Sequence, residues 1–199
     1  MSSETRTALV TGASRGIGRA TAIALAEAGF DVAITARTVV DGDPSSLTED
    51  GKVLPGSLAS TAAEIEALGQ RAVQVPLDLL DREALVPAVE SAISGLGHLD
   101  VVVNNAIYVT GGGPKHFLDT DPDDLVNQMW GDLTAQLLLL QPQVAHMVTR
   151  GGGVVINTML NKSAAIAFLS VLNTHFDCVK TWDGMKGNAV FLCKMGGIA

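Results

Sequence analysis

The stretch TALVTGASRGIG, residues 7–18, decides the fold of this chain. Its first four residues are β-branched or apolar, as in a buried strand, and residues 19–28 after it are strong helix formers. Between them, Gly12 permits a sharp turn, Gly16 lets the backbone approach a pyrophosphate, and Gly18 lets the helix pack closely on the strand. The first N–H groups of that helix have no partner within the helix and therefore suit an anion. The stretch predicts a strand, turn and helix that bind a nucleotide; the alternative is a structural turn that binds nothing.

Composition indicates one globular domain. The chain has 199 residues, 47% of them hydrophobic and 17% charged, which is enough for one well-buried core. A net charge of −8 argues against nucleic acid as a partner, because a phosphate-binding surface needs a basic face. The two cysteines, Cys178 and Cys193, give neither a disulfide framework nor a metal-ligand spacing. No basic-then-apolar leader precedes Thr7 and no apolar run is long enough to span a bilayer, so we expect a soluble, cytoplasmic protein with no membrane partner.

Strands and helices alternate along the rest of the chain. Further strands are expected at residues 31–36, 72–79, 99–104 and 154–158, and helices at residues 58–68, 85–96 and 122–148. This pattern predicts a parallel sheet with helices on both faces, which binds ligands at the carboxyl ends of its strands. Pro87 and Pro142 are expected to bend their helices. The polar residues 38–57 are long for a connection between a strand and a helix, and they predict either a lid beside a ligand or a surface insertion.

The spacing T-G-x-x-x-G-x-G, together with Asn104-Asn105-Ala106 after the fourth strand, resembles the short-chain dehydrogenase/reductase family. The resemblance covers about residues 7–158 and implies a Rossmann-like, doubly wound α/β parallel sheet that is incomplete at its C-terminal side. It also implies a nicotinamide dinucleotide, with Asp78 accepting from the adenine amino group; the alternative for Asp78 is a carboxylate that caps a turn. The residues implied to bind this cofactor are Gly12, Ser14, Arg15, Gly16, Ile17, Gly18, Arg37, Asp78, Leu79, Asn104, Asn105 and Ala106.

Two arginines bear on the choice of cofactor. An NAD site has a carboxylate after the second strand, on the ribose hydroxyl, whereas an NADP site has an arginine on the 2′-phosphate. This chain has Arg37 at that point and Arg15 inside the glycine turn, with no acid there. The sequence therefore favours NADP(H) over NAD(H); the alternative is two solvated surface arginines.

The catalytic residues of the family are not matched in this chain. The family uses a Tyr-x-x-x-Lys pair as an acid/base, with a serine and an asparagine in support. The one tyrosine, Tyr108, has Gly112 four residues further on, so the pair is absent. The other positions hold Asp132 for the asparagine, Met159 and Leu160 for the serine, and Val190 for the tyrosine. Lys194 is then the one catalytic candidate, against the alternative of a solvated lysine.

Two further features bear on the chemistry. Ile107 stands where the family has a glycine after Asn-Asn-Ala, and a side chain at that point can crowd the cofactor. In the last part of the chain, His175 and Cys178 are three residues apart, with Asp177 between them, and would share a helix face. Nothing else marks a nucleophile site there.

Composition changes after residue 150. Residues 1–150 hold nine Lys and Arg against 19 Asp and Glu, whereas residues 151–199 hold four against two and contain no proline. We interpret residues 159–199 as a divergent tail of different origin, from a fusion, a frame change or strong drift. Residues 1–158 then form the dinucleotide-binding domain.

Two functions are consistent with the sequence. The first is an NADP(H)-dependent oxidoreductase that acts on a small carbonyl or alcohol. The second is a catalytically inactive or truncated nucleotide-binding relative, because the Tyr-x-x-x-Lys pair and the serine are absent. The apolar helix at 122–148 predicts a buried face or a homo-oligomer, and an incomplete sheet would leave a strand edge open to association.

Overall fold

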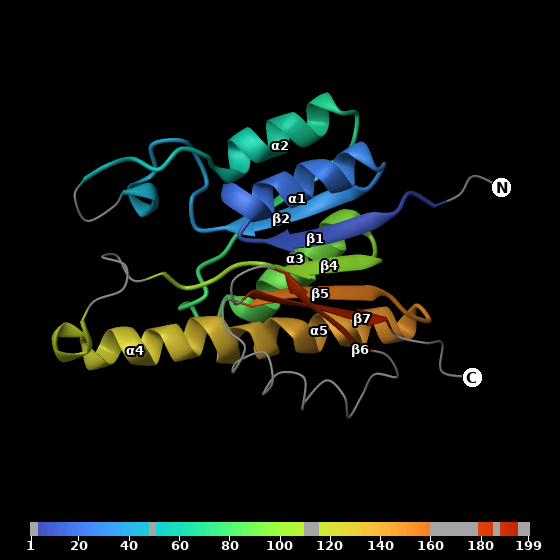
Figure 1. Ribbon diagram of the computed structural model, residues 1–199. Coiled ribbons are helices and arrows are strands. Elements are labelled where there is room, and N and C mark those ends of the chain that lie inside the picture. The colour runs from blue at the N-terminus through green and yellow to red at the C-terminus, as the bar shows by residue number, and fades with distance from the viewer. Residues whose placement is uncertain (1–3, 48–50, 110–115, 160–178, 185–187, 195–199) are drawn as a thin grey trace.

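A seven-stranded sheet forms the centre of the molecule (Figure 1). The computed structural model describes residues 4–47, 51–109, 116–159, 179–184 and 188–194. Five strands are parallel and lie in the order β3-β2-β1-β4-β5. They are β1 (Thr7–Thr11), β2 (Asp31–Ala36), β3 (Ala72–Pro76), β4 (Val101–Asn104) and β5 (Val154–Met159). This order, with its crossover after β3, is that of a Rossmann-like sheet, as predicted.

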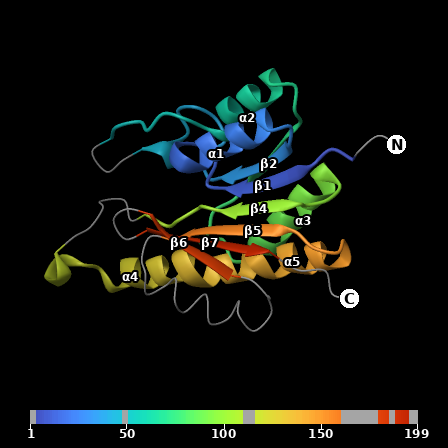
Figure 2. The same ribbon diagram turned by 45° about the vertical axis from the view of Figure 1, so that its right-hand side comes forward.

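Helices cover both faces of the sheet, so the doubly wound arrangement is confirmed (Figure 2). Alternate residues of β1 show why, because Ala8 and Val10 pack into one buried cluster and Leu9 into the other. The first cluster lies under α1 (Gly16–Glu27) and α2 (Leu58–Ala67). The second lies under α3 (Leu85–Leu96) and α5 (Ala135–Thr149).

The parallel part of the sheet ends at β5, and two antiparallel strands continue it. β7 (Asn188–Lys194) pairs with β5, and β6 (Val179–Gly184) pairs with β7. A doubly wound sheet adds its strands through crossovers that keep them parallel, whereas β7 runs against β5. The C-terminal side of the sheet therefore departs from the doubly wound pattern at the point where the composition changes.

The predicted helix at 122–148 is one long helical rod with an irregular turn inside it (Figure 1). α4 (Pro122–Met129) begins with proline at its first position, and the Asp121 side chain accepts from the N–H of Asp123 at 2.9 Å. A π-helical turn, Trp130–Thr134, then leads into α5, which contains Pro142. The π-helical turn lies before Pro142, and a bend at that proline stays a prediction.

The predicted kink at Pro87 is wrong. α3 begins at Leu85, so Pro87 lies in the first helical turn, where an N–H group would have no partner within the helix.

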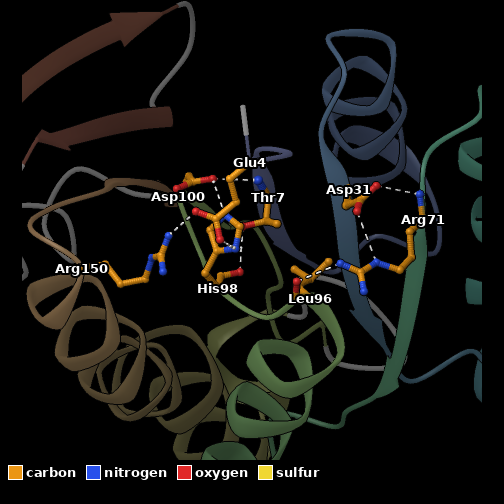
Figure 3. A network of polar contacts seen from close by, with 8 residues as sticks. All are labelled: Glu4, Thr7, Asp31, Arg71, Leu96, His98, Asp100 and Arg150. Atoms are coloured by element: carbon orange, nitrogen blue, oxygen red, sulfur yellow. Dashed lines mark hydrogen bonds and ion pairs between the residues drawn. The ribbon is translucent and has the colours of Figure 1, made fainter. Parts of the chain in front are cut away.

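A polar network fastens the amino ends of the strands (Figure 3). The N–H of Thr7 donates to the Asp100 carboxylate at 2.8 Å, and its hydroxyl donates to the carbonyl oxygen of His98 at 2.7 Å. The buried His98 ring lies between two carboxylates, with Nδ1 3.4 Å from Glu4 and Nε2 3.2 Å from Asp100. Arg150 at the end of α5 also donates to Glu4 at 2.8 Å. These contacts serve stability, because they lie at the end of the sheet opposite to the one where ligands bind.

None of the helices in the described part of the chain has the length and apolar character that a bilayer crossing requires.

Candidate functional site

A cavity of about 340 Å³ lies at the carboxyl ends of the parallel strands. Its walls come from the glycine turn after β1, from the ends of β2 and β3, from the segment after β4, and from part of residues 38–57. Eight of the predicted cofactor-binding residues line it: Gly12, Ser14, Arg15, Arg37, Asp78, Leu79, Asn105 and Ala106. The topology therefore brings together residues from four separate connections, as the sequence predicted for the carboxyl edge.

The glycine turn has no space for side chains at two of its glycines. Gly12 has a φ of +69°, and a Cβ there would lie 2.8 Å from the Cα of Ala106. A Cβ on Gly18 would meet the carbonyl oxygen of Gly12 and would lie 2.6 Å from Nδ2 of Asn105. Gly16 differs, because a Cβ on it would have open space around it. Only its positive φ of +58° favours glycine at this position. α1 starts at Gly16 without a side-chain cap, which leaves its first N–H groups available to an anion.

Thr11 joins the glycine turn to the segment after β4, a role that the sequence analysis missed. Its hydroxyl oxygen accepts from the N–H groups of Asn105 and Ala106, both at 3.0 Å. The side chain of Asn105 returns a hydrogen bond to the carbonyl oxygen of Thr11 at 3.1 Å. The sequence signal for this role was the position of Thr11 directly before Gly12, the first glycine of the motif. These bonds hold the cavity wall at Asn105 and Ala106 against the turn.

The side chain of Asn104 does not line the cavity. It is buried between β4, β5 and α5, where Nδ2 donates to Gln143 and Asn157, both at 3.1 Å. Gln143 returns a hydrogen bond to Oδ1 of Asn104 at 3.2 Å. The cofactor-binding role of Asn104 remains a prediction, and its side chain belongs to a buried amide network.

Arg15, from the glycine turn, and Arg37, from the end of β2, both line the cavity. Nη2 of Arg15 donates to the hydroxyl of Thr38 and to the carbonyl oxygen of Gly56, both at 2.9 Å. Its Nε is buried and has no partner among the described residues. Burial, and then the neighbouring charge of Arg37, lower the pKa of Arg15, while Asp41 acts in the opposite direction. An anion at this wall would offset both effects.

Asp78 fits both interpretations of its role. Its carboxylate accepts from the N–H of Leu80 at 2.9 Å and so caps the turn after β3, and the residue also lines the cavity. Leu79, next to it, is buried against the cavity, and its carbonyl oxygen accepts from the indole N–H of Trp130 at 2.9 Å.

Ile107 and Tyr108 continue the wall after Ala106, and both line the cavity. Asp132, which stands in the family asparagine's place, lies in the π-helical turn and accepts from the N–H of Tyr108 at 2.7 Å. Burial raises the pKa of Asp132, and hydrogen bonds from Tyr108 and Gln128 oppose this rise. A carboxyl group thus holds the cavity wall at the position where the family has an amide.

Several predicted residues lie away from the cavity or outside the described residues. Ile17 projects into solvent, with 69% of its surface exposed. Lys194 pairs in register with Val154, at the first residue of β5, which is the end of the sheet opposite to the cavity. We therefore do not propose a catalytic role for it. Leu160, His175, Asp177 and Cys178 lie outside the described residues, as does the side chain of Met159.

The segment at 38–57 contributes residues that the sequence analysis did not assign. Four of them line the cavity: Thr38, Ser45, Leu47 and Leu54. The only signal for them was the unusual length of the segment.

Together, the strand order and the glycine turn define an α/β protein of the Rossmann type, with a cavity at the carboxyl edge of its sheet. A family model described as enoyl-(acyl carrier protein) reductase matches residues 12–174. An L-rhamnose 1-dehydrogenase (NAD(P)(+)) from a Sphingomonas species is 35% identical over 196 residues, which cover 97% of this chain and 69% of that protein. The chain belongs to the short-chain dehydrogenase/reductase family of oxidoreductases.

Solved structures agree with this assignment. The acetoin dehydrogenase from Enterobacter cloacae is 36% identical with a TM-score of 0.61, over 77% of this chain and 54% of that one. The carveol dehydrogenase from Mycobacterium avium, in complex with NAD, is 29% identical with a TM-score of 0.60, over 74% of this chain and 52% of that one. The chain thus spans about half the length of these solved relatives. The match of the family model extends past residue 158, into residues that the structure does not describe.

Proposed function

We propose that this chain binds NADP(H) in preference to NAD(H) and is an oxidoreductase for a small carbonyl or alcohol. The observation that carries the preference is that two arginines, Arg15 and Arg37, line the cavity and that the charge of Arg37 acts on Arg15. Arg15 has a buried Nε without a described partner, and its pKa is lowered by burial and by the charge of Arg37. A 2′-phosphate would supply the missing negative charge. The name of the Sphingomonas relative, which includes NAD(P)(+), supports a site that admits the phosphate.

The other walls fit the remaining parts of the dinucleotide. The uncapped start of α1 suits the pyrophosphate, and the open space around Gly16 lets a phosphate approach the backbone there. Asp78 is proposed to accept from the adenine amino group, and Asn105 and Ala106 to contact the nicotinamide ribose. When bound, the nicotinamide supplies or accepts the hydride. The chain's own residues orient it and exclude water.

A second function, nucleotide binding without turnover, is favoured by a specific observation. The family's Tyr-x-x-x-Lys pair is absent, since the single tyrosine is followed by Gly112 at the lysine's position. Tyr108 lines the cavity. The group that binds its backbone N–H is the carboxylate of Asp132 and not a lysine. No described lysine lines the cavity to lower the pKa of a catalytic acid.

We also propose a cytoplasmic homo-oligomer that uses the helix at 122–148. No residue of α4 is buried, and three apolar ones, Leu125, Val126 and Met129, expose 53%, 57% and 60% of their surface. Within α5, by contrast, Leu139 and Leu140 are buried in the core, so the leucine run is already covered. We propose that a second copy of this chain packs on the exposed apolar residues of α4.

The experiment that tests the function is a titration of NADPH, with NADH in parallel, followed by cofactor fluorescence. Saturable binding that prefers NADPH supports the proposal, and equal or tighter binding of NADH overturns the preference. Oxidation of NADPH is then measured with a panel of small aldehydes and ketones. Turnover that is lost in a Gly16→Trp variant supports the proposal that the chain is an oxidoreductase. Binding without turnover supports the second function, and binding of neither dinucleotide rejects both.

A further inference from the structure

The segment between β2 and α2 is fastened to the glycine turn at both of its ends. The Arg15 guanidinium bonds to Thr38 at its start and to the carbonyl oxygen of Gly56 near its end, both at 2.9 Å. Gly56 has a φ of +101°, and a Cβ on it would meet the carbonyl oxygen of Ser14. The hydroxyl of Thr61, in α2, donates to the carbonyl oxygen of Ala13 at 2.9 Å. The segment therefore lies directly against the turn.

Further contacts hold the two arms of the segment beside each other. Leu47 and Val53 form an antiparallel bridge, and the N–H of Leu54 donates to the carbonyl oxygen of Ser46 at 2.9 Å. The hydroxyls of Thr38 and Ser45 lie 3.1 Å apart. These bonds determine where the side chains of Leu47 and Leu54 lie relative to the cavity.

Leu47 and Leu54 line the cavity although they remain half-exposed, with 50% and 39% of their surface accessible. Two buried leucines from the end of β3, Leu77 and Leu79, line the same cavity, and Asp78 lies between them in the sequence. Apolar side chains with one carboxylate suit a flat aromatic ring that carries an amino group at its edge. Adenine has this chemistry.

Resting on the proposed function, we propose that Leu47 and Leu54 are positioning residues that pack on the adenine ring of bound NADP(H). The ring covers the two leucines and so removes apolar surface from water, which adds affinity at the adenosine end of the cofactor. Arg15 then has two roles, since the guanidinium that fastens the segment also faces the phosphate. The described residues of this segment, 38–47 and 51–57, thus form a wall of the cofactor site.

The test compares a Leu47→Ser/Leu54→Ser variant with a Val40→Ser control. Val40 belongs to the same segment and is 54% exposed, but it does not line the cavity. Three probes separate the ends of the cofactor: NADPH, 2′,5′-ADP, which keeps the adenine, and reduced nicotinamide mononucleotide, which lacks it. Fluorescence titration and competition give the dissociation constants, and urea unfolding confirms that each variant is folded. The single variants are measured as well.

We expect the double variant to bind NADPH and 2′,5′-ADP about tenfold more weakly, because two apolar contacts are lost. Affinity for the mononucleotide stays unchanged in this variant, and the Val40→Ser control binds all three probes as the wild type does. If the wild type binds NADPH and the double variant binds it equally well, this inference is wrong and the proposed function stands. If the wild type binds neither NADPH nor NADH, the proposed function and this inference are both overturned.

Discussion

The carboxylate of Asp132 accepts a hydrogen bond from the backbone N–H of Tyr108, with 2.7 Å between the two atoms. It joins the π-helical turn of the long helix to the cavity wall after β4. Gly131 allows this close approach, because a Cβ on it would lie 2.6 Å from the Cβ of Tyr108. π-helical turns within longer helices are often found at functional sites. The position of Tyr108 in the wall thus depends on Asp132.

Removing the Asp132 carboxylate is expected to destabilise the fold. Asp132→Ala leaves the N–H of Tyr108 without its acceptor and should lower the free energy of unfolding by about 1–3 kcal/mol. Asp132→Asn keeps an acceptor oxygen and should change it by less than about 1 kcal/mol. Urea unfolding measures both variants. An alanine variant as stable as the asparagine variant would show that this hydrogen bond has no importance for stability.

The difference in stability between the wild type and Asp132→Asn should depend on pH. Burial raises the pKa of Asp132 above its usual value, so the folded state holds this proton more tightly than the unfolded state. The wild-type protein therefore loses stability relative to Asp132→Asn as pH rises from the unfolded pKa, about 3.9, through the folded one. We expect the asparagine variant to gain stability relative to the wild type over the pH range above about 3.9. A stability difference that is constant across this range would contradict the raised pKa.

Gly12→Ala should cost more stability than Gly29→Ala, although both glycines have positive φ. Their φ values are +69° and +85°, so either alanine costs about 1 kcal/mol in backbone strain. A Cβ on Gly12 also approaches Ala106 to 2.8 Å, whereas Gly29 has open space. We expect Gly12→Ala to lose more than about 2 kcal/mol and to bind NADPH weakly, and Gly29→Ala to bind it normally. Urea unfolding and cofactor fluorescence check both, and equal losses would refute the steric argument.

Arg37→Asp should reverse the cofactor preference. The variant loses a cation that the proposal places on the 2′-phosphate and gains a carboxylate suited to a ribose hydroxyl. We expect affinity for NADPH to fall by about 10–100-fold, since a charged hydrogen bond contributes about 1.5–3 kcal/mol, while affinity for NADH is kept or improved.

The matched control for Arg37→Asp is Arg150→Asp. It makes the same change in net charge, but at the amino end of the sheet, where Arg150 contacts Glu4. If Arg150→Asp weakens NADPH binding as much as Arg37→Asp does, the effect is one of net charge and not of a site.

Gln143→Leu tests the buried amide network around Asn104. Gln143 is fully buried and exchanges two hydrogen bonds with Asn104, so its loss leaves polar groups of Asn104 unsatisfied. We expect the free energy of unfolding to fall by about 1–3 kcal/mol. The exposed Gln141 on the same helix is the control, and Gln141→Leu should stay within about 0.5 kcal/mol of the wild type. Denaturant unfolding of the two variants distinguishes a network that stabilises the core from one that does not.

Local features of the sequence were sufficient for the order of strands and helices in the first 158 residues. Strand-forming runs, helix-forming runs and glycines act over a few neighbouring residues, and a parallel sheet then follows from their alternation. This is why the glycine turn, the order of strands and helices, and the carboxyl-edge position of Arg37, Asp78 and Asn105 could be predicted. The family assignment depended on the same local signals.

Only the tertiary structure decided which side chains face the cavity. Asn104 and Asn105 are neighbours in one motif, yet Asn104 is buried in the amide network and Asn105 lines the cavity, because successive side chains leave a strand on opposite faces. Leu47 and Leu54 reach the cavity through bonds from Arg15 to distant parts of the chain, and Lys194 is placed away from it by antiparallel pairing. Contacts of this kind join residues far apart in sequence, and no local pattern records them. The sequence by itself determined the class of fold and the turn that suits a nucleotide, and long-range packing determined the walls around it.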